Sequence, residues 1–293
     1  MNSKNIAKSL KAKLDDWCKN IDNSEITKII KENAIVTGGA LVSLLNGDKP
    51  NDYDIYFKNK ESVLKVSQYY ASIWNKTHED KSLVQIKNED DRIQCFIQSA
   101  GAVMEENENG IDDNSEPETE PFTEETEEEQ KQEKPKYRPR YFSTNAISLS
   151  NDIQIVIRFY GDVDKIHENY DFIHCTCSYD YKNNKVNLPA KALEAIINKE
   201  LIYCGSKYPL CSIIRTRKFL NRGYTINAGQ YLKMALQLNE LDLKDLNVFK
   251  DQLTGVDSAY FSQAIEMIAK KQEEDSNFKV DNTYLFEIIN RIF

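Results

Sequence analysis

Two glycines and two aspartates near the start of the chain are its residues best suited to chemistry. Gly38 and Gly39 follow a short β-branched run at 34–37, and Asp52 and Asp54 are separated by one residue. Paired carboxylates can hold Mg²⁺, a hard cation that takes oxygen ligands and often shares its shell with phosphates. A diglycine lets backbone amides approach a triphosphate closely at the start of a helix. Together these residues predict a site for a metal-bound nucleotide.

Short elements must position these residues. The run at 34–37 predicts a strand, the diglycine predicts a turn that enters a short helix, and the alternation over 52–57 predicts a second strand. Successive side chains on a strand point to opposite faces, so Asp52 and Asp54 are expected on one face and Tyr53 on the other.

Three segments resemble those of a known enzyme class. Residues 38–47 resemble the Gly-Gly-Ala-Val-Arg-Asp-Leu-Leu-Leu-Gly signature of tRNA nucleotidyltransferases (CCA-adding enzymes) and bacterial poly(A) polymerases, which belong to the polymerase β-like nucleotidyltransferase superfamily. Residues 171–180 resemble the family's Arg-Arg-Asp-Phe-Thr-Ile-Asn-Ala-Leu-Ala-Tyr segment, and residues 209–226 resemble its neck helix. The chain is also similar to phage-encoded nucleotidyltransferase-like proteins.

This resemblance implies an α+β fold, with a small mixed-sheet nucleotidyltransferase head and flanking helices, followed by an all-α neck and body. It implies transfer of a nucleoside monophosphate from an NTP to an acceptor hydroxyl on RNA or another polynucleotide, with Mg²⁺ or Mn²⁺ as cofactor. Asp52 and Asp54 would be the catalytic metal ligands. The residues implied to contact the nucleotide are Gly38, Gly39, Ser43, Asp171, Arg215, Arg217 and Lys218.

Three departures from the family pattern remove charged residues that the family uses to select and bind a nucleotide. Val42 and Ser43 replace the Arg-Asp of the signature. Asn169 and Tyr170 replace the two arginines before the Asp-Phe. Lys207, Tyr208 and Cys211 replace the neck motif Glu-Asp-x-x-Arg. CCA addition is therefore not expected. The alternatives are a catalytically degenerate protein that binds nucleic acid or associates with the virion, and nucleotide transfer onto protein side chains.

A third acidic ligand is common in two-metal phosphoryl transfer and is expected on a neighbouring strand. Residues 152–159 give the best candidate strand, on which Asp152, Gln154 and Arg158 share a face. Asp152 is either the third metal ligand or a turn residue in Ser150-Asn151-Asp152. Arg158 either contacts phosphate, as a nucleic-acid-binding residue, or forms a structural ion pair.

Composition limits the class of protein. The 293 residues are 40% hydrophobic, enough for one large or two modest domains. The sequence shows neither an apolar run of membrane-spanning length nor a signal-peptide pattern, which predicts a cytoplasmic protein, in the host cytoplasm if viral, without a membrane partner. Six scattered cysteines are expected to be reduced and buried, and without a paired Cys-x-x-Cys no zinc site is predicted at His174, Cys175 and Cys177.

Most of the net charge of −9 comes from one segment. Residues 105–133 hold 14 acidic residues and one lysine, so the rest of the chain has 37 basic and 33 acidic residues and a charge of +4. Such a polar, proline-containing stretch predicts a disordered insertion. It is either a solvated linker or a mimic of polynucleotide that competes for a basic face.

The predicted organisation has four parts. They are a first part of the head at 1–104, an acidic disordered insertion at 105–136, a second part of the head at 137–186 and a helical neck and body at 187–293. The helix at 210–222 is dense in basic residues and has no acid. It presents either a solvated face or contacts to phosphates of the nucleotide, RNA or DNA, through Arg215, Arg217, Lys218 and Arg222.

Overall fold

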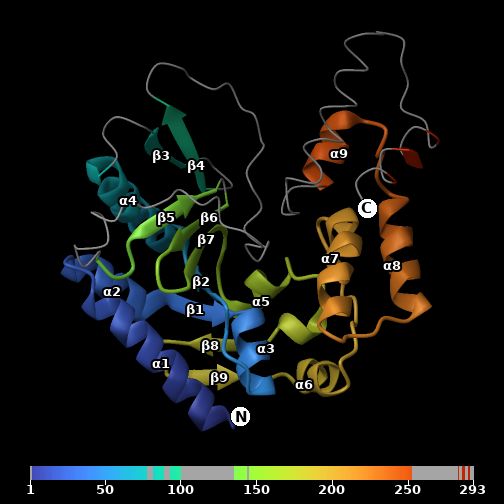
Figure 1. Ribbon diagram of the computed structural model, residues 1–293, viewed down its shortest axis with the longest axis horizontal. Coiled ribbons are helices and arrows are strands. Elements are labelled where there is room, and N and C mark those ends of the chain that lie inside the picture. The colour runs from blue at the N-terminus through green and yellow to red at the C-terminus, as the bar shows by residue number, and fades with distance from the viewer. Residues whose placement is uncertain are drawn as a thin grey trace, which may run out of the picture. The chain divides into compact units, whose positions relative to one another are not determined.

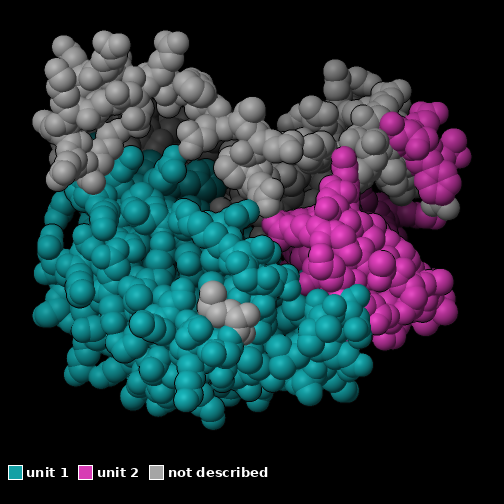
Figure 2. Space-filling model, turned by 60° about the horizontal axis from the view of Figure 1, so that its bottom comes forward, with its two compact units in different colours: residues 1–106, 117–198 teal, residues 107–116, 199–293 magenta. Residues whose placement is uncertain are grey.

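The computed structural model describes residues 2–77, 82–88, 93–99, 135–143 and 145–252, with four single positions near the C-terminus. The chain divides into two compact units between Asn198 and Lys199, which Figure 2 shows in separate colours. Residues 105–134 of the predicted acidic insertion, and most of residues 253–293 of the predicted helical body, lie outside the described residues.

A seven-stranded mixed sheet forms the centre of the first unit, in the order β5-β6-β7-β2-β1-β8-β9 (Figure 1). The strands are β1 (Ala34–Thr37), β2 (Tyr53–Phe57), β5 (Pro139–Phe142), β6 (Ala146–Leu149), β7 (Ile153–Tyr160), β8 (Ser178–Asp180) and β9 (Lys185–Asn187). Only β2 and β7 pair in parallel; the other neighbours are antiparallel. The predicted α+β class with a mixed sheet is confirmed.

One face of this sheet packs against the main hydrophobic core. That core joins Val36 and Ile55 of the sheet to the helices α1 (Ser3–Lys19), α2 (Ser24–Asn33) and α4 (Lys60–Thr77), and to the second sheet of β3 (Ser82–Asn88) and β4 (Ile93–Ser99). The opposite face packs against α5 (Val163–His167) through a smaller apolar cluster that includes Ile35 and Tyr56. The sheet is therefore buried on both faces near its middle.

Helix α1 shows how local sequence builds this core. The Asn2 side chain caps the helix by accepting a hydrogen bond of 2.9 Å from the Asn5 amide. Its buried residues recur at helical spacing and form one apolar stripe, namely Ile6, Leu10, Leu14, Trp17 and Cys18. The Trp17 indole donates a hydrogen bond of 2.7 Å to the Tyr70 hydroxyl of α4, which satisfies its polar group inside the core.

The second unit is mainly helical where it is described. It contains α7 (Pro209–Asn221), α8 (Ala228–Leu238) and α9 (Leu246–Gln252), and the Asn227 side chain caps α8 by accepting from the Gln230 amide. Gln237 of α8 accepts from the Tyr203 hydroxyl at 2.5 Å and donates to the Ser206 carbonyl at 2.9 Å. The short α6 (Ala190–Ile197) belongs to the first unit, and the domain boundary at residue 187 stays a prediction.

The expectation for the cysteines holds in part. All six are free thiols, and Cys18, Cys95, Cys177 and Cys211 are buried, but Cys175 is half-buried and Cys204 is exposed. Burial of Cys204 was therefore wrong, because it lies in an irregular segment between α6 and α7 rather than in an apolar helix or strand. Among the described residues, no helix has the length and apolarity needed to cross a membrane.

Candidate functional site

Gly38 lies directly against Asp54. It joins β1 to α3 (Gly39–Asn46) with φ 86° and ψ −143°, a conformation that side chains other than glycine adopt only with strain. A Cβ atom at Gly38 would lie 3.2 Å from the Asp54 Oδ2 and 3.4 Å from the Tyr170 hydroxyl, whereas one at Gly39 would meet nothing within 4 Å. The glycine turn and one of the two predicted carboxylates therefore form one site.

A row of polar side chains crosses the sheet at Asp54. The register pairs Asp54 of β2 with Gln154 of β7, Gln154 with Ser148 of β6, and Thr37 of β1 with Ser178 of β8. The antiparallel pairing Val36 to Ile55, continued by one residue, sets Thr37 beside Asp54. Residues directly opposite one another share a face. We call these five residues (Ser148, Gln154, Asp54, Thr37 and Ser178) the polar row.

The two predicted metal ligands differ in their setting. Asp54 is half-buried within β2, whereas Asp52 is exposed and precedes the strand, which begins at Tyr53. Strand alternation therefore fixes the face of Asp54 but not that of Asp52.

Two carboxylates suit Mg²⁺, which keeps several waters and shares its shell with substrate phosphates. No cluster of three or more His, Cys, Asp or Glu side chains suited to a metal occurs in the part of the chain that the structure describes. The carboxylate oxygens of Asp54 and Asp52 are donors of the kind that fits Mg²⁺ with phosphates in its shell.

Asp152 does not join Asp54. It and Asn151 have φ of 60° and 63°, the left-handed conformation that Asn and Asp tolerate in turns. Its carboxylate lies 3.9 Å from the Lys13 Nζ, and that ammonium also lies 4.8 Å from the centre of the Tyr53 ring, in the main core. Because Tyr53 and Asp54 point to opposite faces, the ion pair directs Asp152 away from the polar row. The structure favours the turn interpretation of Asp152, and Gln154 takes the position beside Asp54.

Tyr170 covers the site from the side of α5. Its ring lies 5.0 Å from that of His167 and 6.2 Å from that of Tyr56, centre to centre. Burial raises the pKa of the Tyr170 hydroxyl well above its ordinary value, and the nearby Tyr56 and the Asp54 carboxylate raise it further. The hydroxyl therefore stays protonated at neutral pH.

Thr37 connects the end of β1 to α5. Its hydroxyl donates to the Cys177 carbonyl at 2.8 Å and lies 2.8 Å from the His167 Nε2. Because the single Thr37 proton goes to the carbonyl, the Nε2 of His167 is the donor in the second contact. Burial lowers the pKa of His167, with a smaller opposing effect from Asp164. His167 is thus held neutral as a positioning group behind the site.

This burial predicts a pH-dependent stability. In the unfolded chain His167 takes up a proton as the pH falls through 6.5, whereas in the folded protein it stays neutral to a lower pH. The unfolded state then binds more protons, so lower pH destabilises the fold. His167→Gln, which keeps a side-chain donor for Thr37, removes this contribution. Urea unfolding between pH 7.5 and 5.5 should show a smaller loss of stability in the variant; parallel losses would contradict the prediction.

The other predicted site residues lie in several places. Ser43 is half-buried on α3, Asp171 is buried just after Tyr170, and Arg158 is half-buried on β7 with its guanidinium 5.5 Å from the Phe159 ring. The basic residues of α7 belong to the second unit; Arg217 and Arg222 are exposed, and Arg215 and Lys218 are half-buried. Contacts of all these residues with nucleotide or nucleic acid stay predictions.

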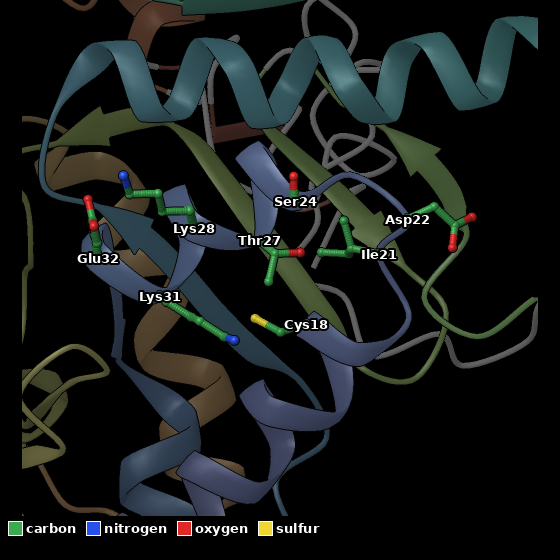
Figure 3. A pocket seen from close by; sticks show the side chains of 8 residues that line it. All are labelled: Cys18, Ile21, Asp22, Ser24, Thr27, Lys28, Lys31 and Glu32. Atoms are coloured by element: carbon green, nitrogen blue, oxygen red, sulfur yellow. The ribbon is translucent and has the colours of Figure 1, made fainter.

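An open hollow of about 580 Å³ lies away from the polar row, between the end of α1 and α2. Figure 3 shows the Lys31 side chain reaching toward Cys18 across it. Its lining mixes two lysines with two acids and so does not favour a polyanion. The lining residues are Cys18, Ile21, Asp22, Ser24, Thr27, Lys28, Lys31 and Glu32.

Comparison with known proteins gives the family. Residues 8–199, which include the whole polar row, match the model described as "Gabija anti-defense 2 family protein". The chain belongs to this family. The protein named Gabija anti-defense 2, from Bacillus phage SPbetaL7, is 21% identical over 281 residues, covering 92% of this chain and 55% of the relative. The chain therefore spans about half the length of the curated relative that it matches, and the resemblance to phage-encoded proteins is confirmed.

Two solved structures are also similar to the chain. The Thermotoga maritima CCA-adding enzyme complexed with tRNA matches 87% of this chain and 54% of its own, with 10% identity and a TM-score of 0.40. A tRNA-processing enzyme with CTP matches 83% of this chain and 57% of its own, with 11% identity and a TM-score of 0.40.

Proposed function

We propose that this member of the Gabija anti-defense 2 family is a metal-dependent nucleotidyltransferase that helps a phage to counter the Gabija defence. It would transfer a nucleoside monophosphate from an NTP to a hydroxyl of RNA or another polynucleotide. The observation that supports this most directly is the contact of the Gly38 turn with Asp54. The backbone suited to phosphate and the carboxylate suited to a metal are so close that a Cβ atom on Gly38 would lie 3.2 Å from the Asp54 Oδ2.

Each group of the site has a role in this reaction. Gly38 lacks a side chain, so the triphosphate can approach the amides at the start of α3. Asp52 and Asp54 would hold Mg²⁺, which neutralises charge on the phosphates when bound. Thr37 and Gln154 fix the surroundings of Asp54 through the sheet register. The acceptor hydroxyl gives up its proton to solvent, its oxygen forms a bond to the α-phosphorus as the α–β phosphoanhydride bond breaks, and pyrophosphate leaves.

A second candidate is a degenerate site that binds a nucleotide without transferring it. Gln154 favours this function, because an amide beside Asp54 cannot act as the third acidic ligand of a two-metal site. The neutral Tyr170, in place of an arginine, points in the same direction. The protein would then act by binding a nucleotide or nucleic acid.

Labelled nucleotides distinguish these functions. The wild-type protein is incubated with each labelled NTP, Mg²⁺ or Mn²⁺, and pools of RNA, DNA and protein. Label on a polynucleotide is the result expected of the transferase. Nucleotide binding without labelled product would favour the degenerate site, and label on protein alone would contradict the assigned acceptor. The same protein is tested for relief of Gabija defence in infected cells.

A further inference from the structure

The segment that contains α7 and α8 carries side-chain charge of one sign. Residues 201–239, between Glu200 and Glu240, hold six basic residues and no acidic one, although acidic residues outnumber basic ones by 47 to 38 in the whole chain. On α4 of the first unit, by contrast, the Lys65 Nζ lies 2.9 Å from a carboxylate oxygen of Glu25. The proposed reaction in the first unit makes no use of the charge on this segment.

Four of these cations lie on α7 or at its C-cap, outside its buried stripe. The stripe is Ser212, Thr216 and Phe219. The four cations are Arg215, Arg217, Lys218 and Arg222. Arg217 and Arg222 are exposed, and the half-buried Arg215 donates from its guanidinium to the Cys211 Sγ at 3.1 Å, a neutral partner. From Arg215 to Arg222 the helix rises about 10 Å, at about 1.5 Å per residue.

Lys199 brings a fifth cation to the C-terminal end of α7. A Cβ atom at Gly223 would lie 3.6 Å from the Lys199 Nζ, so the ammonium lies close to the residue that follows Arg222. The Thr225 amide donates to the Lys199 carbonyl at 2.8 Å, which holds this backbone beside the end of the helix. We call these five residues (Lys199, Arg215, Arg217, Lys218 and Arg222) the basic surface.

Folding of α7 does not account for the basic surface. The helix dipole favours cations in the last turn, which holds Lys218, but its effect fades before Arg217 and Arg215. Lys218 and Arg222 are four residues apart, and like charges at this spacing destabilise a helix. A set of cations that helix stability does not require is suited to a ligand that is itself a polyanion.

We propose that the basic surface binds the sugar–phosphate backbone of a polynucleotide, which is the acceptor in the transfer reaction. The role as acceptor rests on the proposed function, and the inference goes beyond it by assigning the polynucleotide to a surface of the second unit. Phosphates follow one another every 3.4 Å or so along a strand of B-DNA, so a span of about 10 Å meets about three of them. Contacts to phosphate carry no sequence information, so the surface holds strands of any sequence.

Salt titration with the full chain tests this assignment. Binding of short labelled oligo(U) RNA and oligo(dT) DNA is measured without NTP or metal, between about 0.05 and 0.3 M salt. The variant replaces the three exposed cations, as Lys199→Gln, Arg217→Gln and Arg222→Gln. The slope of log affinity against log salt should become shallower by about two, because each phosphate contact of a single strand contributes about 0.7. At about 0.1 M salt the affinity should be about a hundred-fold lower, since this difference acts over the tenfold range up to 1 M.

The matched control removes the same charge from the first unit. It combines Lys4→Gln, Lys8→Gln and Lys191→Gln, three exposed lysines of α1 and α6, and should bind both strands as the wild type does. Equal losses in the two variants would overturn the inference, because they would show an effect of net charge alone. A loss confined to RNA or to DNA would also contradict contact through phosphate.

The inference and the proposed function can fail separately. If the wild type binds neither strand, the basic surface is not a polynucleotide site, while the first unit can still transfer a nucleotide to another acceptor. Binding that responds to the variant as expected, in a protein that labels no acceptor with any NTP, supports the basic surface and contradicts the transferase.

Discussion

An Asp54→Asn chain is expected to lose nucleotide transfer by about a thousand-fold and to keep its fold. The carboxylate is half-buried in β2, against the Gly38 turn, and its proposed role is to hold the metal that neutralises the phosphates. Loss of several kcal/mol of such stabilisation corresponds to a factor of this size. Asparagine has nearly the same shape, so the pairing of β2 with β1 and β7 should persist. Initial rates with labelled NTP and unfolding curves measure the two effects.

Asp152→Asn is the matched control for this variant. Asp152 directly precedes β7, the strand that pairs in parallel with β2, but its carboxylate faces Lys13. Transfer should stay near that of the wild type, with at most a small loss of stability, because the ion pair is long, at 3.9 Å, and only partly buried. Equal activity of Asp54→Asn and the wild type would show that Asp54 is not in the site. Inactivity of Asp152→Asn would restore it as a ligand.

A Gly38→Ala chain is expected to lose both stability and transfer. The φ of 86° is unfavourable for alanine, and the new Cβ would press on the Asp54 Oδ2 at 3.2 Å. Backbone strain of this kind costs about 1–3 kcal/mol in the free energy of unfolding. Displacement of Asp54 should lower transfer by about a hundred-fold, because small shifts of reacting groups have large effects on rate. Chemical denaturation and initial rates measure these changes.

Gly39→Ala is the control that separates the specific effect of a Cβ atom at Gly38 from the general effect of replacing a glycine in this turn. Gly39 is the first residue of α3, and an added Cβ there meets open space. Because alanine keeps the backbone amide through which Gly39 would meet phosphate, this variant should fold as stably as the wild type and should keep most of its transfer activity. If Gly38→Ala and Gly39→Ala behave alike, the close approach of Gly38 to Asp54 has no functional meaning.

The sequence predicted those parts of the site that depend on local pattern. A β-branched run became β1, the diglycine became the turn into α3, and alternation correctly separated the faces of Tyr53 and Asp54. Local pattern failed where a turn begins. Asp52 falls just outside β2. The left-handed backbone at Asp152 breaks the strand alternation that would have placed its side chain on the same face as that of Gln154.

The remaining parts of the site arise from contacts between distant segments. Thr37 precedes the diglycine, yet its neighbour Ser178 and its contact His167 come from far along the chain. In the sequence, Tyr170 stood out only because the resembling family has an arginine at this position. Nothing in its local sequence indicates that its hydroxyl lies close to Gly38. Sheet register and the packing of α5 bring these residues together, and neither follows from periodicity.

The central claim is that Gly38, Gly39, Asp52 and Asp54 hold a metal-bound nucleotide. A crystal structure with Mn²⁺ and an NTP analogue that resists cleavage at the α-phosphorus tests it most directly. We predict an anomalous peak for Mn²⁺ in coordination distance of Asp54 and a triphosphate over the Gly38 turn. Nucleotide bound instead in the hollow between α1 and α2, or Mn²⁺ bound away from Asp54, would contradict the account.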